Sequence, residues 1–484
     1  MTASKVSDLD SRYELFIDGK KRSANSGEWL TTYDPATEEP LTEVASGHEK
    51  DVNDAVSAAS EAQDSWSSVS PDERGRVLEA FAEALLENKE YIATAETLEA
   101  GKPYSQAKED IEGAAKYFRY YAGAADKIHG ETIQRSDEYV TYSVREPYGV
   151  SAHIVPWNFP IDIFARSVAP AIAAGNAAVV KPAEQTSISA LLAAEFACDS
   201  GLPPGVLNVV PGFGATAGAP LAGHPDIDIL GFTGSDVTGR KVASMALDNT
   251  VLSHLELGGK NPQVVFTDAD MEAAIESTLL SIFTVNSGQV CSSGDRLIVQ
   301  EEIHDEFVDR LVSRVEDLEL GAGINDPDMG PVIGEDQYDK VLNYIEIGRE
   351  EVGEPITGGE ALERPGYFIT PTVFDDVPNS ARIAQEEIFG PVLPIITFET
   401  ESEAIEIAND TDYGLVAGVH TSNAGRSQRF AREAEAGQVF INQWFAGGTE
   451  TPFGGYKRSG FGREKGMEGL ESYTQLKTVC QVIE

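Results

Sequence analysis

The chain has 484 residues, of which 41% are hydrophobic, and its formal net charge is −44, from 80 acidic and 36 basic residues. This length allows two or three domains, each with its own apolar core. The negative charge argues against a nucleic-acid partner, because phosphate would be repelled. The acidic residues are dispersed through an ordinary apolar pattern, which argues against disorder. So large a net charge indicates a halophilic protein, because concentrated salt screens the repulsion between its acidic residues.

Three cysteines are present, Cys198, Cys291 and Cys480, with no close pair and no metal-type spacing. We therefore expect neither a disulfide framework nor a bound metal, and a reducing cytoplasm fits. The N-terminus lacks a basic-then-apolar signal pattern, and no stretch reaches the ~18 apolar residues of a membrane span. Secretion and membrane association are not expected.

Helical periodicity dominates residues 51–100 and 104–127, which predicts a layer of covering helices. Residues 138–145 then alternate polar and apolar side chains as a half-exposed strand does, so this segment is a candidate for subunit pairing. The last stretch, residues 473–483, is also predicted to be a strand. Both strands lack an obvious partner and would leave exposed edges in a monomer.

Between these strands, short apolar segments alternate with helices in two series. The first runs from Val150 to Gly258, and the second runs from Gln263 to Asn442. Strands that alternate with helices predict a parallel sheet covered on both faces. The sequence therefore predicts an α/β fold with two such sheets.

The stretch FTVNSGQVC, which ends at Cys291, places a single thiol after a small polar turn. The preceding segment has helical apolar spacing, and Asn286, Ser287 and Gly288 are residues that end a helix and turn the chain. We interpret Cys291 as a nucleophile, which requires a pKa lowered by backbone N–H groups or a cation. The alternative is a buried structural cysteine, since free Cys behaves as a small hydrophobe.

Polar residues follow the ends of two predicted strands, where open α/β sheets bind ligands. Trp157 and Asn158 follow the first strand, and the Asn158 amide could stabilise an oxyanion or could only form a turn. Lys181 and Glu184 follow the second strand and could both reach a ribose diol. A carboxylate there would repel a 2′-phosphate, whereas the alternative is a solvated ion pair.

Two further stretches suggest chemistry. Gly234 and Ser235 lie where a strand passes into a helix, and backbone N–H groups at such a start favour phosphate. The usual three-glycine fingerprint is missing, so this signal is weak alone. Glu256 is flanked by leucines, and desolvation would raise its carboxyl pKa toward the range of a general base.

Seven stretches together carry a family resemblance that covers essentially the whole chain. They are PWNFP, KPAEQT, FTGS, LELGGK, NSGQVC, EEIFGP and PFGGYKRSGFGRE, in this order. In these motifs the chain resembles the aldehyde dehydrogenase superfamily. The resemblance implies a Rossmann-like NAD-binding domain (1–124 and 147–258), a second α/β catalytic domain (259–455) and a small β oligomerisation element (125–146 and 470–484). It also implies a homodimer or homotetramer.

The activity that the resemblance implies is NAD-dependent oxidation of a small-molecule aldehyde to a carboxylic acid. Cys291 would attack the carbonyl, with the oxyanion held by Asn158 and the Cys291 N–H, and Glu256 would activate the water that hydrolyses the thioester. NADP is less favoured than NAD, because of Glu184. The residues matched to cofactor contacts are Trp157, Lys181, Glu184, Gly234, Ser235, Glu387 and Phe389.

The chain departs from many relatives at Arg166 and Ser167, where those relatives carry an aromatic residue followed by lysine. A proton relay through that lysine is therefore in doubt. Arg166 becomes a candidate substrate contact, and Glu464 could serve as a second acid near the thioester. A CoA-acylating dehydrogenase and a non-catalytic structural protein on the same fold are the alternative functions. The sequence does not name the aldehyde.

Overall fold

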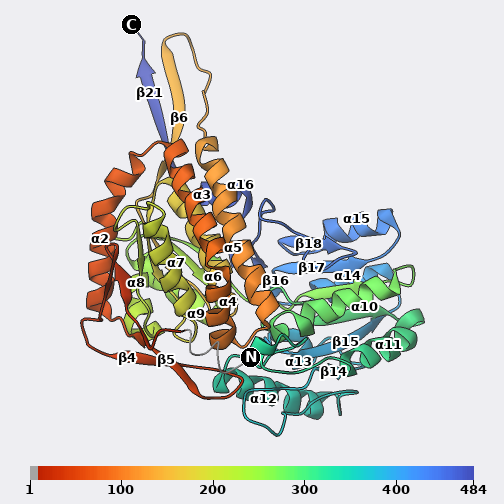
Figure 1. Cartoon of the computed structure of the whole chain (residues 1–484). Coiled ribbons are helices and arrows are strands. Elements are labelled where there is room, and N and C mark those ends of the chain that lie inside the picture. The colour runs from red at the N-terminus through yellow and green to blue at the C-terminus, as the bar shows by residue number, and fades with distance from the viewer. Residues whose placement is uncertain (1–8, 484) are drawn as a thin grey trace.

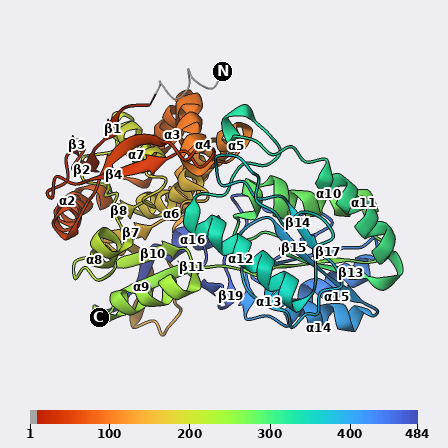
Figure 2. The ribbon, with the colours of Figure 1, turned by 90° about the horizontal axis from the view of Figure 1, so that it is seen from below.

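Two large sheets lie side by side, one built mainly from the N-terminal half of the chain and the other from the C-terminal half (Figures 1 and 2). The computed structural model describes residues 9–483, so the first eight residues of the predicted NAD-binding domain and Glu484 lie outside the described residues. Within the described part of the chain, no helix combines the length and the apolar character that a membrane crossing requires.

The first sheet has eight strands in the order β20-β11-β10-β7-β8-β9-β2-β3. Its five central strands are mutually parallel, which confirms the predicted parallel sheet. The side chains of β8 and β10 are buried throughout, because helices cover both faces of the sheet. The central strands are β7 (Val150–Ile154), β8 (Ala177–Lys181), β9 (Leu207–Val209), β10 (Ile229–Thr233) and β11 (Leu252–Glu256).

The N-terminal strands were not predicted. β2 (Leu15–Ile17) and β3 (Lys20–Arg22) form a hairpin that extends the first sheet, and its turn residues Asp18 and Gly19 have φ of 55° and 68°. Asp-Gly is a preferred pair for such a two-residue turn, so the signal was present in the sequence. A separate three-stranded sheet contains β1 (Arg12–Tyr13), β4 (Trp29–Tyr33) and β5 (Pro40–Ala45).

The predicted helical layer consists of four α-helices, so that prediction is confirmed. Of these helices, α3 and α5 pack against α6, whose residues are buried almost all round, whereas α2 packs against β8. Small residues permit close contact: a Cβ at Gly75 of α3 would lie 2.6 Å from the backbone oxygen of Ala122 in α5. The helices of this half are α2 (Glu49–Ser67), α3 (Pro71–Glu87), α4 (Lys89–Ala100), α5 (Tyr104–Ala124), α6 (Pro160–Ala174), α7 (Ile188–Asp199), α8 (Ala219–Ala222) and α9 (Asp236–Asp248).

The second sheet has six parallel strands in the order β14-β15-β13-β12-β17-β18, as predicted for a second α/β unit. Its strands are β12 (Pro262–Val265), β13 (Arg296–Gln300), β14 (Thr372–Phe374), β15 (Val392–Phe398), β17 (Val416–His420) and β18 (Gln438–Ile441). Its helices are α10 (Met271–Leu279), α11 (His304–Glu316), α12 (Glu335–Glu351), α13 (Arg382–Gln385), α14 (Glu401–Asn409) and α15 (Ala424–Glu433).

The strands predicted for residues 138–145 and 473–483 are confirmed. Each is the partner of the other, which the sequence did not indicate. β6 (Tyr139–Pro147) and β21 (Thr474–Val482) pair with each other in antiparallel register and project from the body of the molecule (Figure 1). Residues 131–133 cover part of the outer edge of β6. Leu476 and Val482 on β21 remain 60% and 65% exposed, so this ribbon presents apolar side chains to solvent.

After the second sheet the chain returns to the first. β16 (Tyr413–Gly414) pairs with β19 (Tyr456–Lys457), and β20 (Gly460–Phe461) then pairs with β11, so that Gly460 lies opposite Glu256. Gly460 has φ of 117°, and a Cβ there would lie 1.9 Å from the Leu255 oxygen, so only glycine fits. The following helix α16 (Gly466–Ser472) packs on α6, beside the first half of the chain (Figure 2).

Candidate active site

Cys291 follows an irregular helix end. α10 continues as a π-helical turn over Leu280–Thr284, and a short 3₁₀ turn over Asn286–Gly288 comes next. The φ angles of Asn286, Ser287 and Gly288 are 47°, 53° and 74°, so the predicted turn is confirmed. A Cβ at Gly288 would lie 2.6 Å from two backbone oxygens, which makes glycine necessary. Such π turns are frequent at functional sites.

Reciprocal hydrogen bonds join this turn to the one that carries Asn158. The Asn286 side chain donates to the Asn158 backbone oxygen (2.9 Å), and Asn158 Nδ2 donates to the Gln289 oxygen (2.9 Å). Asn261 Nδ2 holds the Cys291 oxygen at 2.9 Å. The Cys291 backbone N–H donates to no acceptor within residues 9–483. This N–H and the second Asn158 amide hydrogen are therefore available for an oxyanion.

Cys291 lies between two cavities. One, of about 180 Å³, contains eight of the residues that the sequence analysis selected, and it also contains Gln337 and Lys340 of α12. The other, of about 200 Å³, also has Cys291 in its lining and is bordered by Arg166 of α6 and by Phe453 and Lys465. The selected residues in the first cavity are Trp157, Asn158, Gly234, Ser235, Glu256, Cys291, Glu387 and Phe389.

The Cys291 thiol is half-buried, and burial raises its pKa to about 11. The positive charge of Arg166 acts in the opposite direction but does not outweigh burial. Burial therefore acts against the lowered pKa that a nucleophile requires, because desolvation of the thiolate is a larger effect than the charge of Arg166. The resting residue is a thiol, and its reaction requires removal of a proton.

Glu256 ends β11 with its side chain in the first cavity and only 3% exposed. Neither of its carboxylate oxygens accepts a hydrogen bond from any residue that the structure describes. Burial raises the pKa of Glu256 well above its usual range, and the negative charge of Glu464 raises it further. The predicted desolvation is confirmed, and a carboxylate with a raised pKa is a stronger base.

Arg166 and Glu464, which the sequence analysis considered separately, form a buried ion pair with side chains 6% and 7% exposed. Arg166 lies in the second cavity together with Lys465, the residue that follows Glu464. The pair affects Glu256 in two ways, because Glu464 raises the pKa of Glu256 and Arg166 lowers it. Two candidate residues from distant parts of the chain therefore act together.

The residues at the first cavity suit the pyrophosphate and ribose groups of a dinucleotide. Ser235 caps the N-terminus of α9 by accepting a hydrogen bond from the Thr238 N–H, so the start of this helix offers N–H groups for a pyrophosphate. Glu387 accepts from the Gly259 N–H at 3.0 Å, and a Cβ at Gly258 would lie 2.3 Å from its carboxylate. Trp157 and Phe389 meet edge to face at 5.3 Å, which gives the cavity an aromatic wall.

Lys181 and Glu184 lie outside the lining of this cavity. Lys181 ends β8, and its Nζ lies 3.0 Å from the Glu184 carboxylate. The Lys181 backbone oxygen accepts from the Val155 N–H, so the pair is next to the strand end that carries Trp157 and Asn158. This is the side of the sheet where a dinucleotide would extend away from Cys291.

The pattern that defines the aldehyde dehydrogenase family matches residues 22–479. Aldehyde dehydrogenase 1 of Tanacetum cinerariifolium is 45% identical over 475 residues, which are 97% of this chain and 95% of that relative. The chain belongs to the aldehyde dehydrogenase family. Retinal dehydrogenase 2 of Homo sapiens is 43% identical, over 98% of this chain and 93% of its own.

Solved structures agree with this assignment. The NAD⁺ complex of an aldehyde dehydrogenase from Bacillus cereus superimposes with a TM-score of 0.98 at 41% identity, over 100% of this chain and 99% of that one. The chain is an enzyme that oxidises aldehydes with NAD as its cofactor, as the sequence predicted. The relatives do not favour the CoA-acylating alternative.

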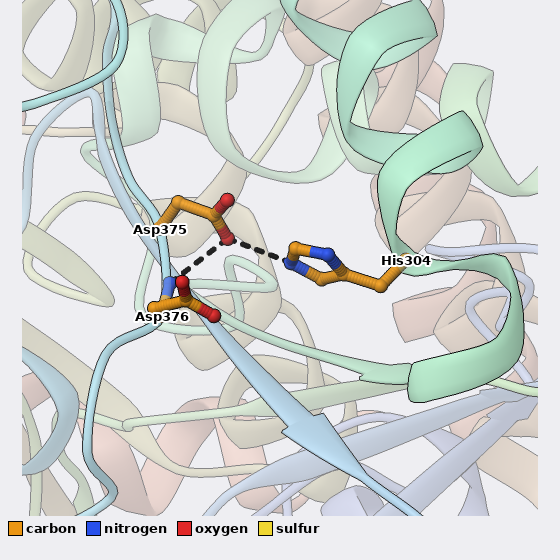
Figure 3. A group of neighbouring side chains, drawn as sticks. All are labelled: His304, Asp375 and Asp376. Atoms are coloured by element: carbon orange, nitrogen blue, oxygen red, sulfur yellow. Dashed lines mark hydrogen bonds and ion pairs between the residues drawn. The ribbon is translucent and has the colours of Figure 1, made fainter.

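The described residues of this aldehyde dehydrogenase bring three potential metal ligands together on its second half: His304, Asp375 and Asp376 (Figure 3). His304 Nε2 lies 2.8 Å from Asp375, and its Nδ1 lies 3.0 Å from Asp305. Burial acts to lower the pKa of His304, but the hydrogen bonds with Asp305 and Asp375 outweigh it, so the pKa is raised. Both ring nitrogens of His304 are already engaged by carboxylates, so the group is a hydrogen-bonded cluster held together by its own members.

Gln337 and Lys340 of the dehydrogenase's first cavity, and most residues that line its second cavity, were not predicted from the sequence. Gln337 and Lys340 come from an amphipathic helix, whose polar face has the pattern of an ordinary solvated surface. Lys465 directly follows Glu464 in a recognised motif, so its position could have indicated it. The remaining residues that line the second cavity are Phe159, Asp162, Ile163, Val285, Val290, Ser292, Phe445 and Phe453.

Proposed function

We propose that Cys291 is the nucleophile of the aldehyde dehydrogenase and that the second cavity receives the aldehyde. The observation that carries this proposal is the position of Cys291, which lines both cavities, with Glu256 on the side of the first. The sulfur loses its proton and bonds to the carbonyl carbon. The oxygen that becomes negative accepts hydrogen bonds from the Asn158 amide and the Cys291 N–H, so its charge is stabilised.

The cofactor binds across the first cavity and the neighbouring strand end that carries Lys181 and Glu184. NAD supplies a hydride acceptor when it is bound. Gly234 and Ser235 receive its pyrophosphate at the start of α9, and Glu387 contacts a ribose. Trp157 and Phe389 form the wall of the cavity, while Lys181 and Glu184 bind the adenosine ribose at the next strand end. The negative charge of Glu184 favours a free 2′-OH over a 2′-phosphate.

Glu256 completes the reaction by taking a proton from the water that attacks the thioester on Cys291. Its raised pKa makes the carboxylate a more effective proton acceptor than an exposed glutamate. The absence of any hydrogen-bond donor to Glu256 among the described residues leaves both oxygens free to orient that water. This favours hydrolysis to a free acid over transfer to the thiol of CoA.

Two variants test these roles. Cys291→Ala should form no NADH above background, because no thiohemiacetal can form. Glu256→Gln should keep a burst of NADH of up to one per active site, while steady turnover falls about 10²–10⁴-fold, the usual value of general-base assistance. Cys480→Ala, which removes an exposed thiol on β21, is the matched control.

The measurement is stopped-flow absorbance at saturating NAD and aldehyde, with hydroxylamine added to intercept the thioester. A lost burst that hydroxylamine does not restore would assign Glu256 to activation of Cys291. Wild-type turnover in Glu256→Gln would remove this residue from the mechanism. Formation of an acyl-CoA, with NADH production that depends on CoA, would replace hydrolysis by acyl transfer.

We also propose that the enzyme is a homodimer or homotetramer in the cytoplasm. The exposed apolar side chains of the β6–β21 ribbon and the open edge of β21 support assembly. The three free thiols support a reducing compartment. The proposed division is an NAD-binding domain (1–124 and 147–258), a catalytic domain (259–455) and an oligomerisation element (125–146 and 470–484). Light scattering in molar KCl that gives a 52 kDa particle would contradict the assembly.

A further inference from the structure

The second cavity combines apolar walls with charged groups. Phe159, Phe445 and Phe453 contribute aromatic rings, and Asp162, Arg166 and Lys465 contribute the charges. A volume of about 200 Å³ is below the ~300 Å³ at which pockets for drug-sized ligands begin. The cavity therefore fits a short substrate, and its charged groups select what the far end of that substrate carries.

Lys465 is the cation without an anionic partner. Its ammonium lies 5.2 Å from the centre of the Phe453 ring and 5.7 Å from that of Tyr117. No residue in the described part of the chain forms an ion pair or hydrogen bond with it. Burial lowers the pKa of Lys465, and the charge of Arg166 lowers it further. An ammonium that is partly withdrawn from water gains from an anion supplied by a ligand.

The other two charged groups do not take this role. The charge of Arg166 is already neutralised by Glu464. Asp162 is directed toward α5, because a Cβ added at Gly113 would lie 2.6 Å from its Oδ1. Burial raises the pKa of Asp162, although the positive charges of Lys465 and Arg166 act in the opposite direction. Among the described residues that line this cavity, Lys465 is therefore the cation that is left to pair with a ligand, since Arg166 is already paired.

We propose that Lys465 binds a carboxylate at the far end of a short aldehyde, so that the substrates of this enzyme are semialdehydes of small dicarboxylic acids. Lys465 and Cys291 line the same cavity, and each influences the pKa of the other. A short chain therefore spans from the thiol to the ammonium. The carboxylate of such a substrate replaces the water lost from Lys465 with a charge-assisted hydrogen bond. This inference rests on the proposed role of Cys291.

The test compares three aldehydes of equal chain length: succinic semialdehyde, butanal and 4-aminobutanal. Lys465→Met removes the charge and keeps the length of the side chain, and Lys465→Arg is the conservative control. The quantity compared is the ratio of kcat/KM for succinic semialdehyde to that for butanal. Loss of Lys465 also changes the pKa of Cys291, but this affects both substrates equally and cancels in the ratio.

The ratio should fall about 10- to 100-fold in Lys465→Met, which is the effect of losing a hydrogen bond between charged groups. Most of this change should come from a higher KM for succinic semialdehyde. Lys465→Arg should restore much of the wild-type ratio. A ratio that stays within about twofold of wild type would overturn the proposal. A wild-type preference for 4-aminobutanal over both other aldehydes would overturn it too, because Asp162 would then be the recognition group.

A binding measurement separates this proposal from the catalytic one. Calorimetry with succinate, at one fixed KCl concentration, reports on the carboxylate site without turnover. Succinate should bind the wild-type enzyme at least about tenfold more tightly than Lys465→Met. Equal affinities would reject the carboxylate site even in an active enzyme. A failure to produce NADH from any aldehyde would reject the catalytic role of Cys291, while the succinate result would still stand.

Discussion

The ion pair between Arg166 and Glu464 should be among the costliest single interactions to break in this enzyme. Exposed ion pairs contribute about 0–1 kcal/mol. These two side chains are only 6% and 7% exposed, so removing one of them leaves the other charge buried and unpaired. The cost of that is about 3–5 kcal/mol. We expect Arg166→Met to lose about this much stability, and Glu464→Gln to be destabilised in the same direction.

The double variant Arg166→Met/Glu464→Gln should recover much of the loss, because neither charge then remains buried. The assay is urea unfolding followed by the fluorescence of the four tryptophans, at one KCl concentration for all four proteins. Urea leaves the screening of charge unchanged, so the cycle isolates the coupling between the two residues. A coupling energy below about 1 kcal/mol would refute the reasoning, since that is the range of a solvent-screened pair.

A second measurement on Arg166→Met examines the electrostatics of the site. Arg166 opposes the rise of the pKa of both Cys291 and Glu256. Its removal should therefore raise both pKa values, and the acid limb of the kcat/KM profile should move to higher pH, because both groups must lose a proton to act. An acid limb that stays in place would mean that Arg166 does not influence these groups.

Three further predictions concern the cofactor, the salt dependence and the thiol. Glu184→Gln should raise the ratio of kcat/KM with NADP to kcat/KM with NAD by about tenfold, because the charge that repels a 2′-phosphate is removed. Equal use of both cofactors by the wild-type enzyme would contradict this role of Glu184. The melting temperature should rise between ~0.1 and ~2 M KCl, because the net charge of −44 is screened, and a flat or falling curve would reject the halophilic interpretation. With a pKa of about 11, roughly one Cys291 thiol in 10³ is ionised at pH 8. The rate at which iodoacetamide alkylates Cys291 in the cofactor-free enzyme should therefore rise about tenfold per pH unit from pH 7 to 10. Peptide mass spectrometry measures this rate, with exposed Cys480 as the internal reference, and a plateau below about pH 9 would show a much lower pKa.

Local sequence was sufficient for features that depend on a few neighbouring residues. The continuous apolar runs of β8 and β10 predict buried parallel strands, and the small polar residues before Cys291 predict its turn. The Asp18–Gly19 hairpin was equally predictable but was overlooked. Local signals of this kind are set by backbone sterics and burial, which need no knowledge of the rest of the chain.

Features that depend on distant pairing could not be predicted. Arg166 and Glu464 are about 300 residues apart, and nothing near either residue indicates that they meet. The raised pKa of Cys291 also escaped prediction, because it follows from burial by both halves of the molecule. Lys340 belongs to a helix whose pattern predicts only a solvated face, and the cavity beneath it exists only in the folded chain.

The return of the chain to its first sheet determines when the enzyme becomes competent during synthesis. β11, which ends in Glu256, receives its neighbour β20 from a segment that is translated about 200 residues later, and Glu464 and Lys465 follow directly after it. At about 5–20 residues per second, a ribosome needs roughly 10–40 s to cover this distance. The nascent chain therefore carries Cys291, Arg166 and Glu256 for a long interval before Glu464, the partner of Arg166, and Lys465 are added. The buried ion pair beside Cys291 is thus completed only about 170 residues after Cys291 itself has been added.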